Sequence, residues 1–316
     1  MIYGQVAYRL PMISTFVLGS LDITRAVMMP ELKQRGGLRD RLDYWSLRAV
    51  PLTLKCRGTT AFTATGFFWR HEQKTFLITN WHVLSGRKTT NLQPVDDKFC
   101  AIPDEVTYPR FLDENNSNLR IEVSTLLRDE DGDVKWFEHT SYGRAVDIAA
   151  IEVPEFIPCD SSPHVNSYVN PVNVIGKNSV ASSNATIPQA WQNRHFEVGC
   201  DVFIVGFPIC RDYSGYFPIW KRGSIATELD VNVKDLPCFL IDTATRPGMS
   251  GSPVILYDLE FSMGEAVRRI NYFMGVYSGR DIGDPEKAQL GIVWRTELIL
   301  DVIMNGKTNF PQPELL

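Results

Sequence analysis

The sequence lacks the features of a membrane-spanning or nucleic-acid-binding protein. No uninterrupted apolar run reaches the roughly 18 residues that a membrane-spanning helix needs. The 32 lysine and arginine residues are fewer than the 37 aspartate and glutamate residues, so the net charge is -5 and no basic surface is expected. We therefore expect neither nucleic acid nor a membrane as a partner. The sequence says nothing about the oligomeric state.

Cysteines are too few and too scattered for a disulfide scaffold, and none has the Cys-x-x-Cys spacing of zinc ligands. The six cysteines are Cys56, Cys100, Cys159, Cys200, Cys210 and Cys238. We expect reduced thiols and a cytoplasmic protein. The apolar stretch 12–21 does not have the basic, apolar and cleavage-site order of an export signal, although export stays the alternative.

The sequence also contains no ligand set for a metal or a cofactor. The acidic run 129–133 lacks the ligand spacing and the terminal glutamate of an EF-hand. We expect a solvated hairpin tip there, no metal and no cofactor.

From Val50 onward, the chain consists of short β-rich runs separated by polar or glycine-containing turns. This spacing favours a sandwich or a barrel. A Pro-, Ser- and Asn-rich stretch suits a linker between two lobes, and Thr296 is placed to cap a helix. The predicted parts are an N-terminal extension (1–47), a first barrel (about 48–155), a linker (about 156–194), a second barrel (about 195–295), a C-terminal helix (about 297–304) and a tail (306–316).

Ser250 is the first candidate for chemistry, in the run Gly248-Met249-Ser250-Gly251-Ser252-Pro253. The two glycines remove side chains that would obstruct a substrate, and they allow backbone angles closed to other residues. The amides of Gly248 and Ser250 can converge on a developing oxyanion. Taken alone, the run fits a structural Gly/Ser loop equally well.

A serine nucleophile needs a histidine base on a rigid element. His82 directly follows the predicted strand 76–81, beside packed apolar residues. The other histidines, His71, His139, His164 and His195, fall in polar or loop-like surroundings. A core histidine without catalytic function is the alternative for His82.

Asp147 is the candidate third member of a triad with Ser250 and His82, because a carboxylate must hold the imidazole in the correct tautomer. It interrupts the otherwise apolar predicted strand 145–153, where an unpaired charge is costly. A purely structural hydrogen-bonding role is the alternative. The order His82, Asp147, Ser250 is that of the chymotrypsin-type triad, whereas the subtilisin and α/β-hydrolase triads run in other orders.

Three segments resemble the signature segments of trypsin-like serine peptidases. They are Ile78-Thr79-Asn80-Trp81-His82-Val83, Val146-Asp147-Ile148-Ala149 and Arg246-Pro247-Gly248-Met249-Ser250-Gly251-Ser252-Pro253. The resemblance is nearest to the bacterial HtrA-type branch and covers about 50–303. It implies an all-β, chymotrypsin-like double β-barrel, with the peptidase domain at 48–305.

This resemblance also implies roles for the three residues. His82 is expected as general base and then acid, Asp147 as its orienting partner and Ser250 as the nucleophile that forms an acyl-enzyme. The amides of Gly248 and Ser250 are expected to form the oxyanion hole. The expected function is hydrolysis of peptide bonds in protein or peptide substrates.

Substrate-binding positions follow from the same resemblance. The segment 275–280 looks like the strand that pairs with substrate backbone. The residues implied are Ala244, Thr245, Ser278, Gly279 and Arg280. Ala244 stands where trypsins carry an acidic residue, which argues against selection for lysine or arginine. Arg280 suggests a preference for acidic substrates, with a solvated loop arginine as the alternative.

Some residues depart from the pattern. Met249 replaces the aspartate that pairs with a freed N-terminus in digestive trypsins, so activation by clipping is not expected. Ser252 replaces a common glycine, which we expect to be tolerated. We also expect no PDZ module after Val302.

Two other functions compete with the peptidase. One is a catalytically silent module that uses the fold for binding or regulation, against which the intact triad speaks. The other is an esterase, whose usual fold has a different triad order.

Overall fold

The computed structural model describes residues 21–28, 43, 45–96, 101–111, 119–154, 157–158, 166–167, 196–208, 217–260, 268–280 and 289–306. The predicted linker therefore lies mostly outside the described residues, as does most of the predicted tail. The extension is described only in part.

The first half of the chain forms an eight-stranded sheet, in the order β1-β6-β5-β2-β3-β4-β8-β7. Its strands are β1 (Leu21–Met28), β2 (Ala49–Cys56), β3 (Thr59–His71), β4 (Lys74–Thr79), β5 (Glu105–Phe111), β6 (Leu119–Leu126), β7 (Trp136–Phe137) and β8 (Ala149–Val153). The neighbours in this sheet pair antiparallel.

The second half forms a closed antiparallel barrel, in the order β11-β12-β13-β16-β15-β14. Its strands are β11 (Asp201–Gly206), β12 (Ile219–Ile225), β13 (Cys238–Asp242), β14 (Pro253–Glu260), β15 (Arg268–Arg280) and β16 (Leu290–Arg295). A short pair, β9 (Ile157–Pro158) and β10 (Asn166–Ser167), forms a separate sheet.

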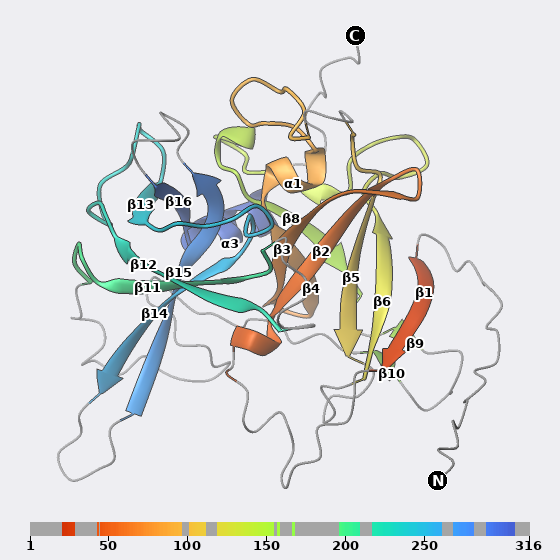
Figure 1. Cartoon of the computed structure of the whole chain (residues 1–316). Helices are drawn as coiled ribbons and strands as arrows, with labels where there is room; N and C mark the ends of the chain where they lie inside the picture. The colour runs from red at the N-terminus through yellow and green to blue at the C-terminus, as the bar shows by residue number, and fades with distance from the viewer. Residues whose placement is uncertain are drawn as a thin grey trace, which may run out of the picture.

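Figure 1 shows the two β units side by side, with few helices around them. The helices among the described residues are η2 (Trp45–Leu47), α1 (Trp81–Ser85), η3 (Gly143–Ala145) and α3 (Glu297–Asn305). The predicted C-terminal helix is confirmed as α3, which contacts both β8 and β16. The architecture confirms the predicted fold class, a mostly β, chymotrypsin-like double barrel.

Alternation along β4 explains how the two units share a core. Leu77 belongs to the apolar core of the first unit, whereas Phe76 and Ile78 belong to a core formed by residues of both units. Successive side chains of a strand point to opposite faces, so β4 is buried on both sides. Its end is therefore held rigidly, and the site residues follow directly after it.

Trp45 anchors the start of the described core. Its side chain is 1% exposed, stacks on Phe273 with ring centroids 5.3 Å apart, and donates a hydrogen bond to Asn271. In addition, β1 pairs with β6. Parts of the predicted extension thus join the sheet and the core, and the boundary at residue 48 stays a prediction.

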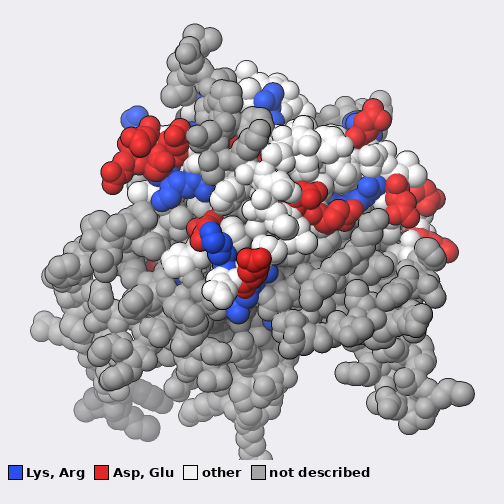
Figure 2. Space-filling model, turned by 180° about the vertical axis from the view of Figure 1, so that it is seen from behind, with Lys and Arg blue, Asp and Glu red and all other residues white. Residues whose placement is uncertain are grey.

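Charged side chains of both signs are mixed on the described part of the face seen in Figure 2. On the face seen in Figure 2, acidic and basic side chains lie next to one another, and the described part of that face has no broad basic area. Among the described residues, no helix is both long and apolar enough to cross a membrane.

Truncating Trp45 tests whether this residue belongs to the folding unit. We expect Trp45→Ala to lower the free energy of unfolding by about 3–5 kcal/mol, because a buried aromatic ring is replaced by a cavity. Trp45→Phe keeps a stacked ring, so its free energy of unfolding should fall much less. Urea unfolding measures both, and a loss below about 1 kcal/mol for the alanine variant would contradict the role of Trp45 in the core.

Candidate active site

His82 lies in a short helix rather than directly on a strand. The strand β4 ends at Thr79, and α1 starts at Trp81, so the predicted strand extending to Trp81 is wrong at its end. Asn80 is extended, and its carbonyl accepts hydrogen bonds from two amides of α1. Gly86, at a φ of 66°, ends the helix by donating to the His82 carbonyl. This turn brings the His82 ring back towards the end of β4.

Asp147 precedes a strand instead of interrupting one. The predicted strand 145–153 is shorter than expected, because η3 occupies Gly143–Ala145 and β8 begins at Ala149. The backbone at Asp147 is not available for a ladder, since its carbonyl accepts a hydrogen bond of 2.7 Å from the Asn80 side chain. The carboxylate is thereby held at the strand entrance, facing α1.

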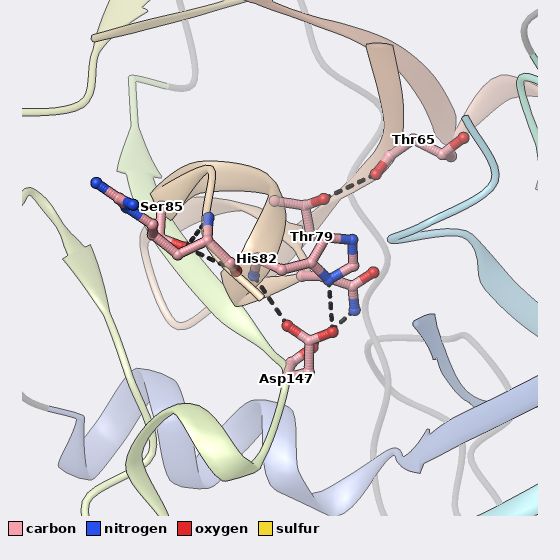
Figure 3. A network of polar contacts seen from close by, with 7 residues as sticks. Thr65, Thr79, His82, Ser85 and Asp147 are labelled. Atoms are coloured by element: carbon pink, nitrogen blue, oxygen red, sulfur yellow. Dashed lines mark hydrogen bonds and ion pairs between the residues drawn. The ribbon is translucent and has the colours of Figure 1, made fainter. Parts of the chain in front are cut away.

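Asp147 binds His82 at two points (Figure 3). Its Oδ1 accepts from the His82 backbone amide at 2.9 Å, and its Oδ2 lies 2.6 Å from His82 Nδ1. The two side chains are 6% and 16% exposed, respectively. An ionised carboxylate only accepts hydrogen bonds, so Nδ1 carries a proton and Nε2 is left with its lone pair. The contact therefore favours the tautomer that a base requires.

Ser250 lies on a turn built by glycines. Gly248 and Gly251 have φ values of 95° and 85°, which non-glycine residues rarely adopt. Among the described residues, the amides of Gly248 and Ser250 donate no hydrogen bond, whereas those of Met249, Gly251 and Ser252 do. These two N–H groups are thus available to a ligand, as an oxyanion hole requires.

Thr65 of β3 makes four hydrogen bonds, and two of them hold this turn against the first unit. Its amide donates to the Ser250 carbonyl at 2.9 Å, and its hydroxyl donates to the Gly248 carbonyl at 2.8 Å. The same hydroxyl accepts from the Phe207 amide, and the Thr65 carbonyl accepts from the Thr79 hydroxyl. Figure 3 shows the Thr79 contact, three residues before His82. The serine turn and the histidine helix are therefore tied to the same residue.

Close packing at this junction explains Gly251. A Cβ atom at this position would collide with the Thr65 carbonyl and the Thr79 hydroxyl. Within the described residues, however, no hydrogen bond joins the His82 ring to Ser250 Oγ. Catalytic hydrogen bonds are often long in free enzymes and tighten when a substrate binds.

Met249 and Ser252, the two residues near Ser250 that depart from the family pattern, are both buried. Met249 packs in the core of the second barrel. Ser252 is fully buried beside Gly206, where a Cβ would collide with the Ser252 hydroxyl. The Ser252 hydroxyl therefore fits because residue 206 is glycine, although it has no hydrogen-bond partner among the described residues.

The predicted substrate-binding residues fall into two groups. Gly279 of β15 lies beside the nucleophile, since a Cβ there would be 3.9 Å from Ser250 Oγ, and Ser278 is half-buried next to it. Ala244 is exposed, whereas Thr245 is buried and shares a hydrogen bond with the Tyr277 hydroxyl. The side chain of Arg280 lies outside the described residues.

A buried carboxylate supports the helix that carries His82. Glu138 Oε1 accepts from the indole nitrogen of Trp81 at 2.5 Å and from that of Trp136 at 3.2 Å. Burial raises the pKa of Glu138, and the two indole hydrogen bonds oppose that rise. Its neighbour His139 is also buried, in a loop as predicted, and its Nδ1 accepts from the Ser141 and Tyr142 amides.

Sequence reasoning proposed His82, Asp147 and Ser250 but did not single out Thr65, Thr79 or Glu138. A threonine in a strand rich in threonine and alanine carries no signal of its own. The local sequence of Glu138 gives no sign that the indole of Trp81, which is 57 residues away, donates to it. Only the pairing of distant segments identifies these residues.

Removing the Thr65 hydroxyl tests the junction. Thr65→Val leaves the buried Gly248 carbonyl and Phe207 amide without partners, so we expect unfolding free energy to fall by about 1–3 kcal/mol. We also expect faster hydrogen exchange at the amides of residues 248–252. Thr65→Ser retains the hydroxyl and serves as the control. Equal exchange in the valine and serine variants would argue against the hydrogen bonds.

Glu138 should make stability depend on pH. The pKa of Glu138 is higher in the folded state than in the unfolded state, so the unfolded chain loses the carboxyl proton at a lower pH. The free energy of unfolding therefore falls as the pH rises from the unfolded-state pKa to the folded-state pKa. Glu138→Gln can still accept both indole hydrogen bonds but cannot ionise. We expect its stability relative to the wild type to increase between pH 4 and pH 7, measured by urea unfolding. A relative stability that decreases over this range would contradict the raised pKa.

Comparisons with known proteins agree with this architecture. The family described as "Trypsin-like peptidase domain" matches residues 64–261, more than half of the 316 residues. No curated protein matches the chain.

Solved structures resemble the chain at low identity. The serine endoprotease from Yersinia pestis has a TM-score of 0.44 and 13% identity, over 83% of this chain and 63% of that chain. The chain thus spans 63% of the length of that endoprotease. The active form of the Rv3671c protease from M. tuberculosis has a TM-score of 0.44 and 16% identity, over 85% of each chain. On the evidence of the family match, the chain belongs to the trypsin-like peptidases.

Proposed function

We propose that this protein is a serine endopeptidase that hydrolyses peptide bonds of protein substrates. The observation that carries the proposal is the buried Asp147 carboxylate, which accepts hydrogen bonds from both the backbone and the ring of His82. Such an arrangement leaves Nε2 as a base and stabilises the ring once it is charged. A binding module has no use for this pairing next to a glycine-flanked serine.

In the proposed reaction, Ser250 Oγ attacks the carbonyl carbon of the substrate while His82 Nε2 takes its proton. The amides of Gly248 and Ser250 stabilise the oxyanion of the tetrahedral intermediate. His82 then gives the proton to the leaving amine, and an acyl-enzyme remains on Ser250. Water, deprotonated by His82, attacks the acyl group, and the second intermediate collapses to release the acid and regenerate the Ser250 hydroxyl.

The position of Gly279 supports β15 as the strand that binds substrate backbone. A residue without a side chain beside Ser250 Oγ leaves room for the scissile bond. We propose Ser278, Gly279 and Arg280 as substrate contacts on this strand, with Ala244 and Thr245 on the opposite segment. The thiols of Cys56 and Cys200 support the proposed cytoplasmic location.

Labelling with a fluorophosphonate probe tests the proposed roles. Wild-type protein should react at Ser250, and Ser250→Ala should not react. His82→Ala should react about 10²–10⁴-fold more slowly, because the base that activates the nucleophile is lost. Ser141→Ala, which changes an exposed serine, is the control and should react like the wild type.

The readout is intact-protein mass spectrometry, with circular dichroism to verify that each variant is folded. A folded wild type that does not react would favour the catalytically silent binding module. Labelling that persists in Ser250→Ala would exclude Ser250 as the nucleophile.

A further inference from the structure

A cavity of about 420 Å³ lies behind the Ser250 turn, and the proposed mechanism assigns no role to most of its lining. It is lined by Pro208, Ile219, Lys221, Ala244, Thr245, Arg246, Met249 and Gln289. Ser250, Ser278 and Gly279, which would contact a substrate, do not line it. The cavity therefore shares Ala244 and Thr245 with the proposed substrate contacts, whereas Lys221, Arg246 and Met249 lie outside those contacts.

Two cations line this cavity without a carboxylate partner. On β12, Arg222 pairs with Asp201 of β11 at 2.6 Å. Its neighbour Lys221 and the loop residue Arg246 form no ion pair within the described part of the chain. Lys221 is half-buried, so its charge is less screened than that of an exposed side chain. Among the described residues, the half-buried Lys221 and the exposed Arg246 thus give this cavity positive charge without a paired carboxylate.

The remaining lining is largely apolar. Ile219, Met249, Ala244 and Pro208 provide an aliphatic wall, with Met249 itself almost fully buried. Pockets of this size hold small ligands, and a few placed charges fix the orientation of the ligand. A ligand that satisfies both features has an aliphatic part and one negative charge.

We propose that this cavity binds a carboxylate attached to an aliphatic group, with Lys221 and Arg246 holding the carboxylate. Met249 and the segment 244–246 form both the cavity wall and the approach to Ser250. A bound ligand therefore stabilises the turn that supplies the amides of Gly248 and Ser250. This second part rests on the proposed function, whereas binding itself does not.

Binding is tested with hexanoate by isothermal titration calorimetry on the Ser250→Ala protein, so that catalysis plays no part. Hexanoate should bind, and hexylammonium, with the same chain length and the opposite charge, should not. Lys221→Gln and Arg246→Gln should each raise the dissociation constant about tenfold, because a charge-assisted hydrogen bond is lost. Arg57→Gln, an exposed cation between β2 and β3, should leave it unchanged.

Absence of hexanoate binding, equal binding of hexylammonium, or an unchanged constant in both cavity variants would overturn the site. N-acetyl-leucine, titrated in parallel, represents a peptide C-terminus. If N-acetyl-leucine binds more tightly than hexanoate, the site is assigned to the C-terminus of a polypeptide. If it binds more weakly than hexanoate, the site is assigned to a free aliphatic acid.

The effect on the turn is measured with the wild type. Hexanoate should increase the rate of fluorophosphonate labelling, and Lys221→Gln should abolish the increase without changing the basal rate. A labelling rate independent of hexanoate would overturn the coupling. Failure of the proposed function would instead appear as no labelling under any condition, with hexanoate binding intact.

Discussion

The hydrogen bonds of Thr65 are the constraint on which the site depends. The serine turn belongs to the second barrel, whereas His82 and Asp147 belong to the first unit, so no local interaction fixes their mutual geometry. Thr65 accepts and donates through its amide, hydroxyl and carbonyl, and it contacts the turn, the end of β11 and the end of β4. Because these groups are buried, any displacement would leave unpaired polar atoms. A small misplacement of reacting groups is costly in catalysis, so such a junction has functional value.

The shared apolar core explains why the junction is stable. Phe67 and Ile78 of the first unit pack in one cluster with Ile255 and Phe273 of the second. Helix α3 adds Ile299 to the same cluster and joins β8 to β16. The hydrophobic contacts supply most of the free energy that holds the two units together, and the Thr65 hydrogen bonds select one relative position of the two units. The pairing of Asp147 with His82 then requires only the local order of α1 and the loop before β8.

Much of the architecture could be predicted from the sequence, because the strands are short, apolar and separated by glycine or polar turns. The order of His82, Asp147 and Ser250 also specified which residues should come together. The boundaries at these residues could not be predicted. Asp147 lies before β8 and not within it, because its carbonyl and carboxylate bind Asn80 and His82, and such partners are invisible to periodicity.

The supporting residues were beyond sequence reasoning for the same reason. Thr65, Glu138 and Gly206 act through segments that are distant in the chain, and their own surroundings have no distinctive pattern. The cavity behind the Ser250 turn likewise depends on β12 and the segment 244–249 lying side by side. The sequence therefore indicates the candidate catalytic residues, whereas the residues that support them are identified only by tertiary contacts.

The most direct test of the central claim is the appearance of new peptide termini when an unfolded protein is incubated with this protein, as detected by tandem mass spectrometry. The account predicts that the wild type generates new termini and that a folded Ser250→Ala variant generates none. Equal cleavage by both proteins, or no cleavage by either under conditions where the wild type is folded, would contradict it.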